Sequence, residues 1–386
     1  MKNVSLAFMC NNINPSAGGT ERVTRFVADR LAKEGCNCFY IYSHIDDDAV
    51  ANTHKLMIDQ YDNIDKLKNQ MLEFVTNKDV DVLIVVNQIY QTRKYQTVYK
   101  YLKAKTNVKI VGCLHAAPDN WKKVDKPSIV LPKIFIKSRL KRWLCCFYNR
   151  NAQKSVGMYN VSDRFLLLSD RYIPTFCKTF HIDDSSSHKL IAIPNPCPFK
   201  DEYNGEPRKN VVLIVSRMAE IQKRIFFALK VWHKIYDKTR AWSLVIVGDG
   251  PQLNDYKYYA SKKRLDNVQF VGHSNNVSDY YKTSRVFLMT SVWEGQPMSV
   301  IEAMHYGCVP VVVDSFESIH DLVFEGRNGV LCKYNDIDDV SEKLAALLEN
   351  EKMIDDYSTD ILNNKNEYFS EESIIAKWTK LITSLV

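Results

Sequence analysis

The chain has 386 residues, which is long enough for two domains that each bury a hydrophobic core. Its 46% hydrophobic and 25% charged residues are ordinary for a globular protein and exclude a disordered or fibrous chain. No apolar run reaches about 18 residues, so the sequence predicts no membrane-spanning helix. The ten cysteines have no zinc-site spacing, and most lie in apolar runs, which indicates buried thiols in a cytosolic protein.

The net charge of +7 comes from one segment of the chain. Between residues 122 and 154, ten lysines and arginines stand against a single acid, Asp125, so this segment holds +9 and the rest of the chain −2. Such a local patch argues against a nucleic-acid-binding protein, which would show a broad basic face. The patch instead favours contact with one anionic surface.

A helix within that segment is predicted to carry apolar residues on one face and basic residues off it. The apolar residues are Ile136, Leu140, Trp143, Leu144 and Phe147, and the basic ones are Lys137, Arg139, Lys141 and Arg142. Two interpretations stay open: the helix lies on an anionic membrane, or its apolar face packs within a domain. In the second case the basic face could still contact phospholipid headgroups or the pyrophosphate of an acceptor.

The first half of the chain alternates strand-like and helix-like stretches. Strands are predicted at residues 4–8, 39–43, 82–86, 108–113, 165–169 and 190–193. This alternation predicts an α/β fold with a parallel sheet covered by helices on both faces. The first of these runs is too short for a signal peptide, so a cytoplasmic location is expected.

Two places in the first half are candidates for ligand contact. Gly18-Gly19 lies between the first strand and a helix expected to run to about Glu34, and the backbone amides of such a loop can approach an anion. His115 follows the strand that ends at Cys113, at the carboxyl edge where open α/β sheets bind ligands. For the glycines a plain tight turn, and for the histidine a structural role, stay open as alternatives.

The second half of the chain repeats the α/β pattern. Strands are predicted at residues 211–215, 244–247, 268–271, 286–290, 309–313 and 330–332. The polar segment 199–209, with Gly205 and Pro207, is expected to link the two halves. A last helix is predicted from Glu371 to Leu385, and its apolar face consists of Ile375, Trp378, Leu381 and Ile382.

Two basic residues stand at the carboxyl edge of the second half. Arg217 directly follows the strand at 211–215, and Lys223 lies in Gln222-Lys223-Arg224, which is expected to open a helix. Ligands bind at this edge in open α/β sheets. Two cations fixed there suit a diphosphate, because they stabilise the negative charge that develops when it leaves.

A second loop at the same edge is suited to phosphate. The strand at 286–290 is followed by a turn containing Gly295 and Pro297 and then by a short helix expected at 301–305. The free N–H groups of Met298 and Ser299, together with the helix dipole, place partial positive charge at one point. We therefore expect these two amides to contact phosphate oxygens.

Two carboxylates flank this loop. Glu294 lies before the turn, and Glu302 is expected on the first helical turn. One acid can therefore face a sugar while the other binds ribose hydroxyls, with the phosphates between them. Gly272-His273 ends a neighbouring predicted strand, and its backbone is a candidate contact for a nucleobase.

Several of these stretches together resemble a known family. They are Ser216-Arg217 with Lys223, Gly248-Asp249-Gly250-Pro251, Phe270-Val271-Gly272-His273, and Glu294 with Glu302. Their order and spacing resemble the retaining GT-B glycosyltransferases of glycosyltransferase family four, whose two acids are separated by seven residues as they are here. The resemblance covers nearly the whole chain, although Pro196 stands where the family usually has the glycine of Pro-Asn-Gly.

The resemblance implies two Rossmann-like parallel-sheet domains that face a cleft. An acceptor-side domain is expected at 1–198, a linker at 199–209 and a nucleotide-sugar-binding domain at 210–368. A C-terminal helix at 369–386 is expected to cross back onto the first domain, anchored by Trp378.

The resemblance also implies an activity, namely transfer of a sugar from a nucleotide-diphosphate sugar, with UDP as the expected nucleotide, to a glycan or lipid-linked acceptor. The implied roles are diphosphate binding by Arg217 and Lys223, ribose binding by Glu302, sugar orientation by Glu294, a sugar hydroxyl or reaction-centre contact by His115, and a donor-phosphate and acceptor contact by Gly19. The leaving phosphate would take the acceptor proton on the same face, so neither a separate base nor a metal ion is expected. Asp46-Asp47-Asp48 lies in a polar loop and is expected to be solvated.

The implied setting is bacterial surface-polysaccharide synthesis on a lipid-linked carrier, with peripheral contact at the inner membrane face through residues 122–154 as one interpretation. Two alternatives remain. A GT-B nucleotide-sugar epimerase would need acid and base groups on both sugar faces, and only His115 and Glu294 are available. A catalytically silent sugar-nucleotide-binding scaffold is disfavoured, because a decayed site should have lost at least one of Arg217, Lys223, Glu294 and Glu302.

Overall fold

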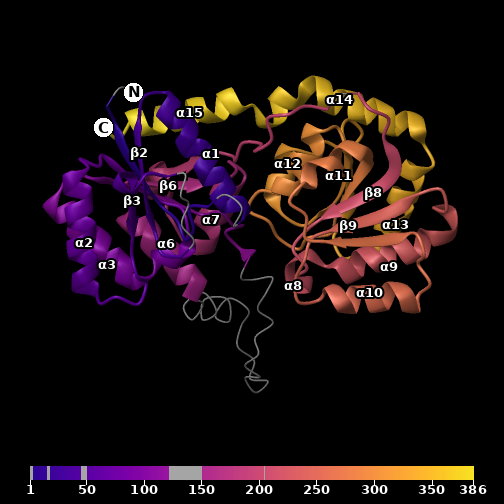
Figure 1. The fold of residues 1–386 in the computed structure, drawn as a ribbon, viewed down its shortest axis with the longest axis horizontal. Helices are drawn as coiled ribbons and strands as arrows, with labels where there is room; N and C mark the ends of the chain where they lie inside the picture. The colour runs from indigo at the N-terminus through magenta and orange to yellow at the C-terminus, as the bar shows by residue number, and fades with distance from the viewer. Residues whose placement is uncertain (1–2, 15–17, 45–49, 121–149, 204) are drawn as a thin grey trace, which may run out of the picture. The chain divides into compact units, whose positions relative to one another are not determined.

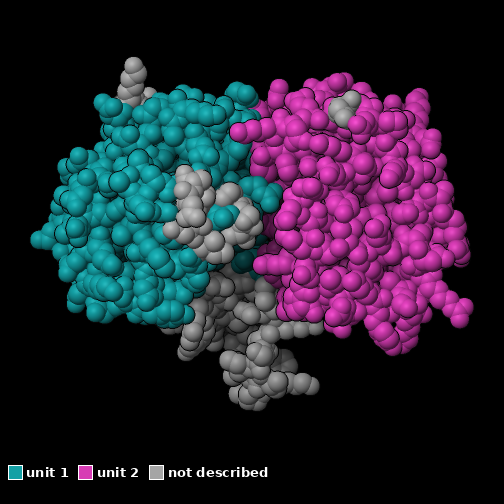
Figure 2. Space-filling model, in the orientation of Figure 1, with its two compact units in different colours: residues 1–196, 371–386 teal, residues 197–370 magenta. Residues whose placement is uncertain are grey.

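The computed structural model describes residues 3–14, 18–44, 50–120, 150–203 and 205–386 (Figure 1). The chain divides into two compact units (Figure 2). Unit 1 consists of Met1–Pro196 with Glu371–Val386, and unit 2 of Cys197–Ser370. The predicted basic helix at 136–147 and the aspartates at 46–48 lie outside the described residues. Among the described helices, none is both long and apolar enough to cross a membrane.

The described part of unit 1 is built on a seven-stranded parallel sheet with the order β3-β2-β1-β4-β5-β6-β7. Its strands are β1 (Ser5–Met9), β2 (Asn37–Tyr42), β3 (Lys55–Met57), β4 (Val82–Val85), β5 (Lys109–Cys113), β6 (Arg164–Leu167) and β7 (Leu190–Ala192). Each predicted strand of this half is present within a residue or two. The sequence did not indicate β3, a three-residue edge strand that is only half-buried and therefore lacks an apolar run.

Helices cover this sheet, as the strand–helix alternation predicts. They are α1 (Gly19–Lys33), α2 (Ile64–Asn77), α3 (Arg93–Lys105), α6 (Arg150–Val161), α7 (Tyr172–Phe180) and α15 (Glu371–Thr383). In α1, the residues Val23, Val27 and Leu31 recur at helical spacing and are buried.

The C-terminal helix α15 packs against α1 within unit 1 (Figure 1). Its buried face consists of Ile374, Ile375, Trp378, Leu381 and Ile382. An ion pair between Arg30 Nε and Glu371 Oε1, 2.6 Å apart, joins the two helices at the start of α15. The prediction that the last helix crosses back onto the first domain is therefore confirmed.

Unit 2, over its described residues, contains a six-stranded parallel sheet with the order β10-β9-β8-β11-β12-β13. Its strands are β8 (Lys209–Val215), β9 (Ser243–Val247), β10 (Val268–Gly272), β11 (Ser284–Met289), β12 (Val309–Asp314) and β13 (Val330–Lys333). Its helices are α8 (Glu220–Lys223), α9 (Ile225–Ile235), α10 (Leu253–Lys262), α11 (Val277–Thr283), α12 (Met298–His305), α13 (Ile337–Leu348) and α14 (Glu351–Phe369). On one face α9 packs with α10 and α13, and on the other α12 packs with α11 and α14 (Figure 1).

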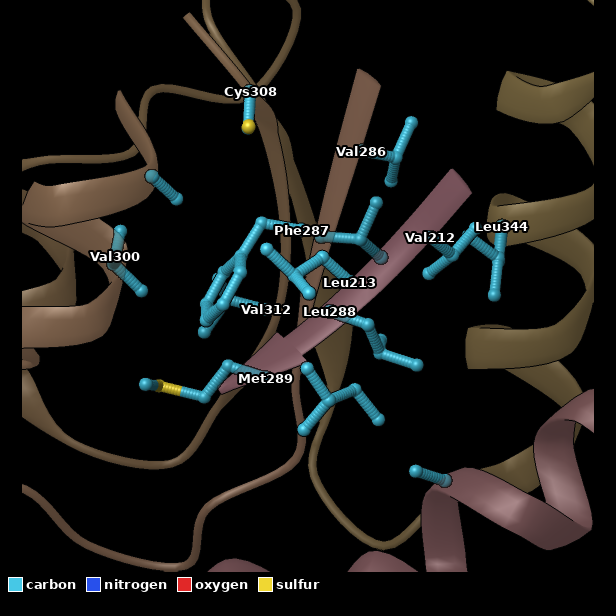
Figure 3. Close-up of a cluster of buried hydrophobic side chains, with 14 of the residues drawn as sticks. Val212, Leu213, Val286, Phe287, Leu288, Met289, Val300, Cys308, Val312 and Leu344 are labelled. Carbon is cyan, nitrogen blue, oxygen red and sulfur yellow. The ribbon is translucent and has the colours of Figure 1, made fainter. Parts of the chain in front are cut away.

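The core of unit 2 lies on both faces of its central strands. Val286, Phe287 and Leu288 of β11 are each at most 1% exposed. Figure 3 shows side chains of β8, β11 and β12 between Val300 of α12 on one side and Leu344 of α13 on the other. Such two-sided burial explains why the central parts of these strands are continuous apolar runs in the sequence, because neither face of the strand meets water there.

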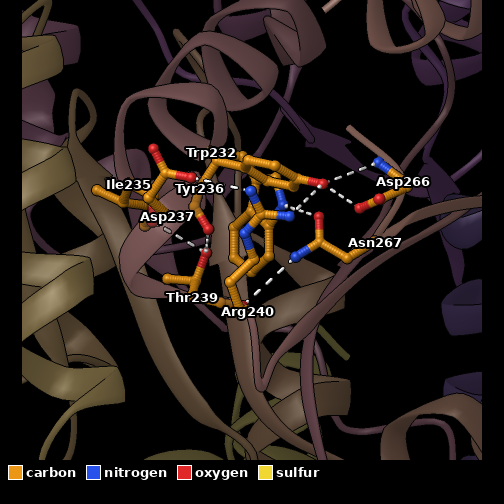
Figure 4. Close-up of polar contacts among 8 residues, drawn as sticks. All are labelled: Trp232, Ile235, Tyr236, Asp237, Thr239, Arg240, Asp266 and Asn267. Atoms are coloured by element: carbon orange, nitrogen blue, oxygen red, sulfur yellow. Dashed lines mark hydrogen bonds and ion pairs between the residues drawn. The ribbon is translucent and has the colours of Figure 1, made fainter. Parts of the chain in front are cut away.

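A partly buried polar cluster lies at the amino ends of β9 and β10 (Figure 4). Asn267 Oδ1 accepts a hydrogen bond from Trp232 Nε1 at 3.0 Å, and Asn267 Nδ2 donates to the backbone oxygen of Trp242 at 2.9 Å. Thr239 Oγ1 donates to the backbone oxygen of Ile235 at 3.1 Å. These contacts connect the end of α9 to the start of both strands, at the sheet edge opposite the candidate site.

Replacing Asn267 with alanine should lower the free energy of unfolding by about 2 kcal/mol, because the buried indole N–H of Trp232 loses its acceptor. The sugar transfer that the family resemblance implies should keep its rate per folded molecule, since the candidate site lies at the other edge of the sheet. Urea unfolding and a turnover assay check both expectations. Asp237→Ala, which removes an exposed ion pair with Arg240, is the control and should change stability by less than about 0.5 kcal/mol.

Candidate active site

Three loops meet at the carboxyl edge of the unit 2 sheet. The Ser216 amide donates to Val247 O at 3.0 Å, the Met218 amide to Asp249 O at 2.8 Å, and the Gly248 amide to Gly272 O at 2.8 Å. Gly248 has a φ of +137°, and a Cβ there would lie 1.9 Å from the backbone oxygen of Ser216. Only glycine therefore allows the loops after β8 and β9 to approach this closely.

The turn that carries Lys223 differs from the predicted one. Gln222-Lys223-Arg224 was expected to open a helix, but Lys223 is the last residue of the one-turn helix α8. Arg224 then adopts the left-handed conformation, with a φ of 53°, and α9 begins at Ile225. Thr290 Oγ1, just beyond β11, donates to the backbone oxygen of Lys223 at 2.9 Å, and this bond fixes the turn against the end of that strand.

Lys223 and Glu294 form a direct ion pair. Lys223 Nζ lies 2.5 Å from Glu294 Oε1, and the two side chains are only 16% and 11% exposed. The structure therefore brings together the cation and the acid that the sequence placed on separate loops. A charge pair so shielded from water is held by a short, charge-assisted hydrogen bond.

Gln222 joins this pair to Arg217. Its Nε2 donates to Glu294 Oε2 at 3.3 Å and to the backbone oxygen of Trp293 at 3.1 Å. Its Oε1 accepts from Nη2 of Arg217, an exposed side chain, at 3.3 Å. No role was predicted for Gln222, and its position next to Lys223 was the one signal in the sequence that could have indicated it.

The helix α12, which follows the turn at Gly295 and Pro297, begins earlier than predicted. α12 starts at Met298, and the amides of Val300 and Ile301 donate to the backbone oxygen of Pro297 at 2.9 and 3.2 Å. Met298 and Ser299 thus occupy the first two helical positions, where backbone N–H groups point out of the helix end. This placement agrees with the amide site expected there.

The position of Glu302 is a correction. It was expected on the first helical turn, but it is the fifth residue of α12 and its carboxylate is buried, with the residue 8% exposed. Oε2 of Glu302 accepts a hydrogen bond from Tyr281 Oη at 2.9 Å. The carboxylate is therefore held toward α11, the helix that follows the Gly272-His273 loop.

Gly272 and His273 lie where β10 ends. Gly272 has a φ of +83°, and no atom lies within 4 Å of a Cβ built on it, so the space beside this residue is open. The His273 ring is exposed and contacts Asn275 Oδ1 through Nε2 at 3.2 Å. Because Gly272 O also holds the Gly248 amide, this loop is tied to the loop that contacts Ser216.

The two candidates of the first half lie in unit 1. Gly19 is the exposed first residue of α1. His115 lies two residues beyond the end of β5 and borders a small cavity whose lining also includes Phe8, Val23, Asn195 and Trp378. Burial lowers the pKa of the His115 ring from 6.5 to about 4, so the ring is neutral near pH 7.

This lowered pKa of His115 makes the stability of unit 1 depend on pH. Below about pH 6.5 the His115 ring of the unfolded chain binds a proton, whereas the folded ring does not accept one until about pH 4. The free energy of unfolding should therefore decrease as the pH is lowered from about 6.5 to about 4, by up to about 3 kcal/mol. His115→Asn should flatten this part of the profile. Unfolding measured at several pH values from 7 to 4 checks it, and parallel profiles for the two proteins would contradict it.

The described residues contain no group of three or more His, Cys, Asp or Glu side chains that could hold a metal ion. Arg217 and Lys223 place positive charge at the carboxyl edge of the unit 2 sheet. The cysteines in the described part of the chain are free thiols. Burial raises the pKa of the thiols of Cys113 and Cys308 to about 12, so they are protonated and inert near pH 7.

Comparison with known proteins identifies the class of this enzyme. Residues 198–363 match the model of the family described as glycosyl transferases group 1. The chain is 26% identical over 382 residues to an uncharacterized glycosyltransferase of Haemophilus influenzae, covering 98% of this chain and 99% of that protein. It is 25% identical over 315 residues to the UDP-Gal:alpha-D-GlcNAc-diphosphoundecaprenol alpha-1,3-galactosyltransferase of Escherichia coli, covering 79% and 78% of the two chains.

A solved structure supports the fold. HepE of Anabaena in complex with UDP-glucose superposes with a TM-score of 0.72 over 98% of this chain and 99% of that one, at 13% identity. Two parallel Rossmann-like sheets with a returning C-terminal helix define the GT-B fold, as predicted. The match to the group 1 glycosyltransferases, which are glycosyltransferase family four, covers residues 198–363 and agrees with the family that the sequence resembles.

Proposed function

We propose that the protein transfers a sugar from a UDP-sugar to a glycan or lipid-linked acceptor during synthesis of a bacterial surface polysaccharide. The observation that carries this proposal is the shielded Lys223–Glu294 pair, linked through Gln222 to Arg217 at one sheet edge. The choice of UDP is supported by the donor named for the E. coli relative and by the UDP-glucose bound to HepE. The diphosphoundecaprenol acceptor of that relative supports a lipid-linked acceptor here.

In this proposal the donor diphosphate lies between basic side chains and backbone amides. Lys223 has three N–H donors, so it can keep Glu294 while donating to a phosphate oxygen. Arg217 and the amides of Met298 and Ser299 supply the remaining donors. No divalent ion is then needed, because these groups stabilise the charge that develops on the leaving UDP.

The sugar and the nucleoside lie on either side of that diphosphate. Glu294 orients sugar hydroxyls, Glu302 binds the ribose, and the backbone at Gly272 and His273 contacts the base. In unit 1, we assign His115 to a hydrogen bond with a sugar hydroxyl or the reaction centre. Gly19 remains the proposed backbone contact for donor phosphate and acceptor.

The transfer needs no separate base. The acceptor oxygen forms a bond to the anomeric carbon while the bond from that carbon to the UDP oxygen breaks. The proton of the acceptor hydroxyl passes to the departing phosphate on the same face, so the anomeric configuration is retained.

Peripheral membrane contact through residues 122–154 stays a prediction from sequence, because most of that segment lies outside the described residues.

The proposal is tested by measuring thermal shifts with a panel of UDP-, GDP- and ADP-sugars in the presence of EDTA. We expect a UDP-sugar to raise the melting temperature of the wild type and to have no effect on Arg217→Ala/Lys223→Ala. The control is Lys230→Ala/Lys257→Ala, which removes two exposed lysines from α9 and α10 and should respond like the wild type. A shift with GDP- or ADP-sugars alone, or one abolished by EDTA, would contradict the UDP donor or the metal-free site, respectively.

A further inference from the structure

A buried hydrogen bond joins two helices behind the proposed nucleoside position. Tyr281 Oη on α11 donates to Glu302 Oε2 on α12 at 2.9 Å. Tyr281 is 0% exposed and Glu302 is 8% exposed. A carboxylate removed from water needs hydrogen-bond donors from the protein, and a charge-assisted bond is among the stronger ones available. Tyr281 is therefore a main determinant of where this carboxylate lies.

The Tyr281 ring has little freedom to turn. It stacks on Tyr306 with ring centroids 6.2 Å apart and planes 16° apart, and it also contacts Phe199 and Phe287. Tyr306 is itself fixed by a 2.9 Å hydrogen bond from its hydroxyl to Asp201 Oδ1. Because the rings are packed in this way, the Tyr281 hydroxyl has one direction, and it points to Glu302.

The bond also connects two parts of the proposed nucleoside site. α11 follows the loop at Gly272 and His273, which is proposed to contact the base, and it carries Tyr281. Glu302, which is proposed to contact the ribose, lies on α12. The Tyr281–Glu302 bond thus sets the position of the ribose acid relative to the helix that follows the base loop.

We infer that Tyr281 is a positioning residue for nucleotide recognition: it holds Oε2 of Glu302 so that the carboxylate meets the ribose hydroxyls. This inference rests on the proposed role of Glu302 in binding ribose. It adds a residue that touches no ligand yet sets how strongly the enzyme distinguishes a ribose from a deoxyribose.

The test compares the affinities of UDP, 2′-deoxy-UDP and 3′-deoxy-UDP, measured by calorimetry, for the wild type and Tyr281→Phe. The substitution removes one hydroxyl and keeps the packed ring. Wild type should prefer UDP over at least one deoxy analogue by about tenfold or more, which is the effect of a hydrogen bond to a charged group. In Tyr281→Phe, UDP should bind about tenfold more weakly, the deoxy analogue nearly as in wild type, and the preference should approach one.

Two further variants serve as a control and as a second test of the inference. Tyr280→Phe removes the neighbouring tyrosine hydroxyl on the same helix, and it should keep the wild-type preference. Glu302→Gln should lose the ribose preference, and adding Tyr281→Phe to it should have little further effect. Glu302→Gln also tests the inference if Tyr281→Phe folds poorly. If Glu302→Gln keeps the full preference for UDP over the deoxy analogues, the inference is overturned.

Different results would contradict the positioning role of Tyr281, the ribose role of Glu302 and the UDP donor. A wild-type protein that prefers UDP, with a Tyr281→Phe variant that keeps the full preference, overturns the positioning role and leaves the transferase proposal standing. A wild-type protein that binds UDP and both deoxy analogues equally overturns the ribose role of Glu302 and the inference with it. Failure to bind UDP at all overturns the UDP donor itself.

Discussion

Replacing Lys223 with alanine should lower kcat for sugar transfer by about 10³-fold or more, because in the proposed mechanism the leaving diphosphate loses the cation closest to Glu294, the acid proposed to orient the sugar. The same change leaves Glu294, whose side chain is 11% exposed, without its counterion. A buried charge that loses its partner destabilises the fold, so the free energy of unfolding should fall as well. Steady-state kinetics and urea unfolding measure the two effects separately.

The double variant Lys223→Ala/Glu294→Ala separates chemistry from stability in this experiment. Removing both charges should restore much of the lost stability, whereas activity should stay at the level of the less active single variant. Lys230→Ala, an exposed lysine on the nearby α9, should match the wild type in both measurements. A kcat for Lys223→Ala within about tenfold of the wild type would remove the lysine from the mechanism.

Replacing Trp378 with alanine should cost unit 1 about 3–5 kcal/mol, the range found when a large buried aromatic side chain is truncated. Trp378 is 7% exposed and lines the same cavity as Phe8, Val23 and His115. Its loss would enlarge this cavity and leave α15 with a much smaller apolar contact. Water would then reach His115, and the pKa of its ring should rise from about 4 toward its ordinary value.

Because the protein has two units, the effect of Trp378→Ala should be measured by hydrogen exchange resolved along the chain. Peptides from α1 and α15 should lose protection, while peptides from β11 and α12 keep it. Lys377→Ala changes the adjacent exposed residue on the same helix and should alter stability by less than about 0.5 kcal/mol. Equal protection of α15 in the wild type and Trp378→Ala would show that the indole does not anchor the helix.

The strands were predictable because a buried parallel strand is a continuous apolar run, as Val286 to Met289 illustrates. The edge strand β3 has no such run, so only its pairing with β2 reveals it. The helix boundary at Arg224 was not predictable, because a left-handed arginine follows no local sequence rule and is held by Thr290, 66 residues away along the chain. The local pattern of apolar residues therefore indicated where strands and helices lie, whereas contacts between residues distant in the sequence determined the boundary at Arg224.

The candidate site shows the same division. Strand ends and a glycine turn were enough to place Arg217, Lys223 and Glu294 at one sheet edge. The partners of those residues were not predictable, because Gln222 and Tyr281 act through side-chain directions that one-dimensional spacing does not encode. Glu302 illustrates the limit, since its helix was predicted but the face on which its carboxylate lies was not.

The return of α15 to unit 1 reverses the usual order of folding during synthesis. Domains generally fold as they leave the ribosome, the N-terminal one first. Here residues 197–370 are complete before residues 371–386 have been made, so the unit begun first is finished last. Until residues 371–386 have been made, the apolar surface that α15 covers beside α1 stays uncovered on the nascent chain, so unit 1 cannot close before unit 2 has been synthesised.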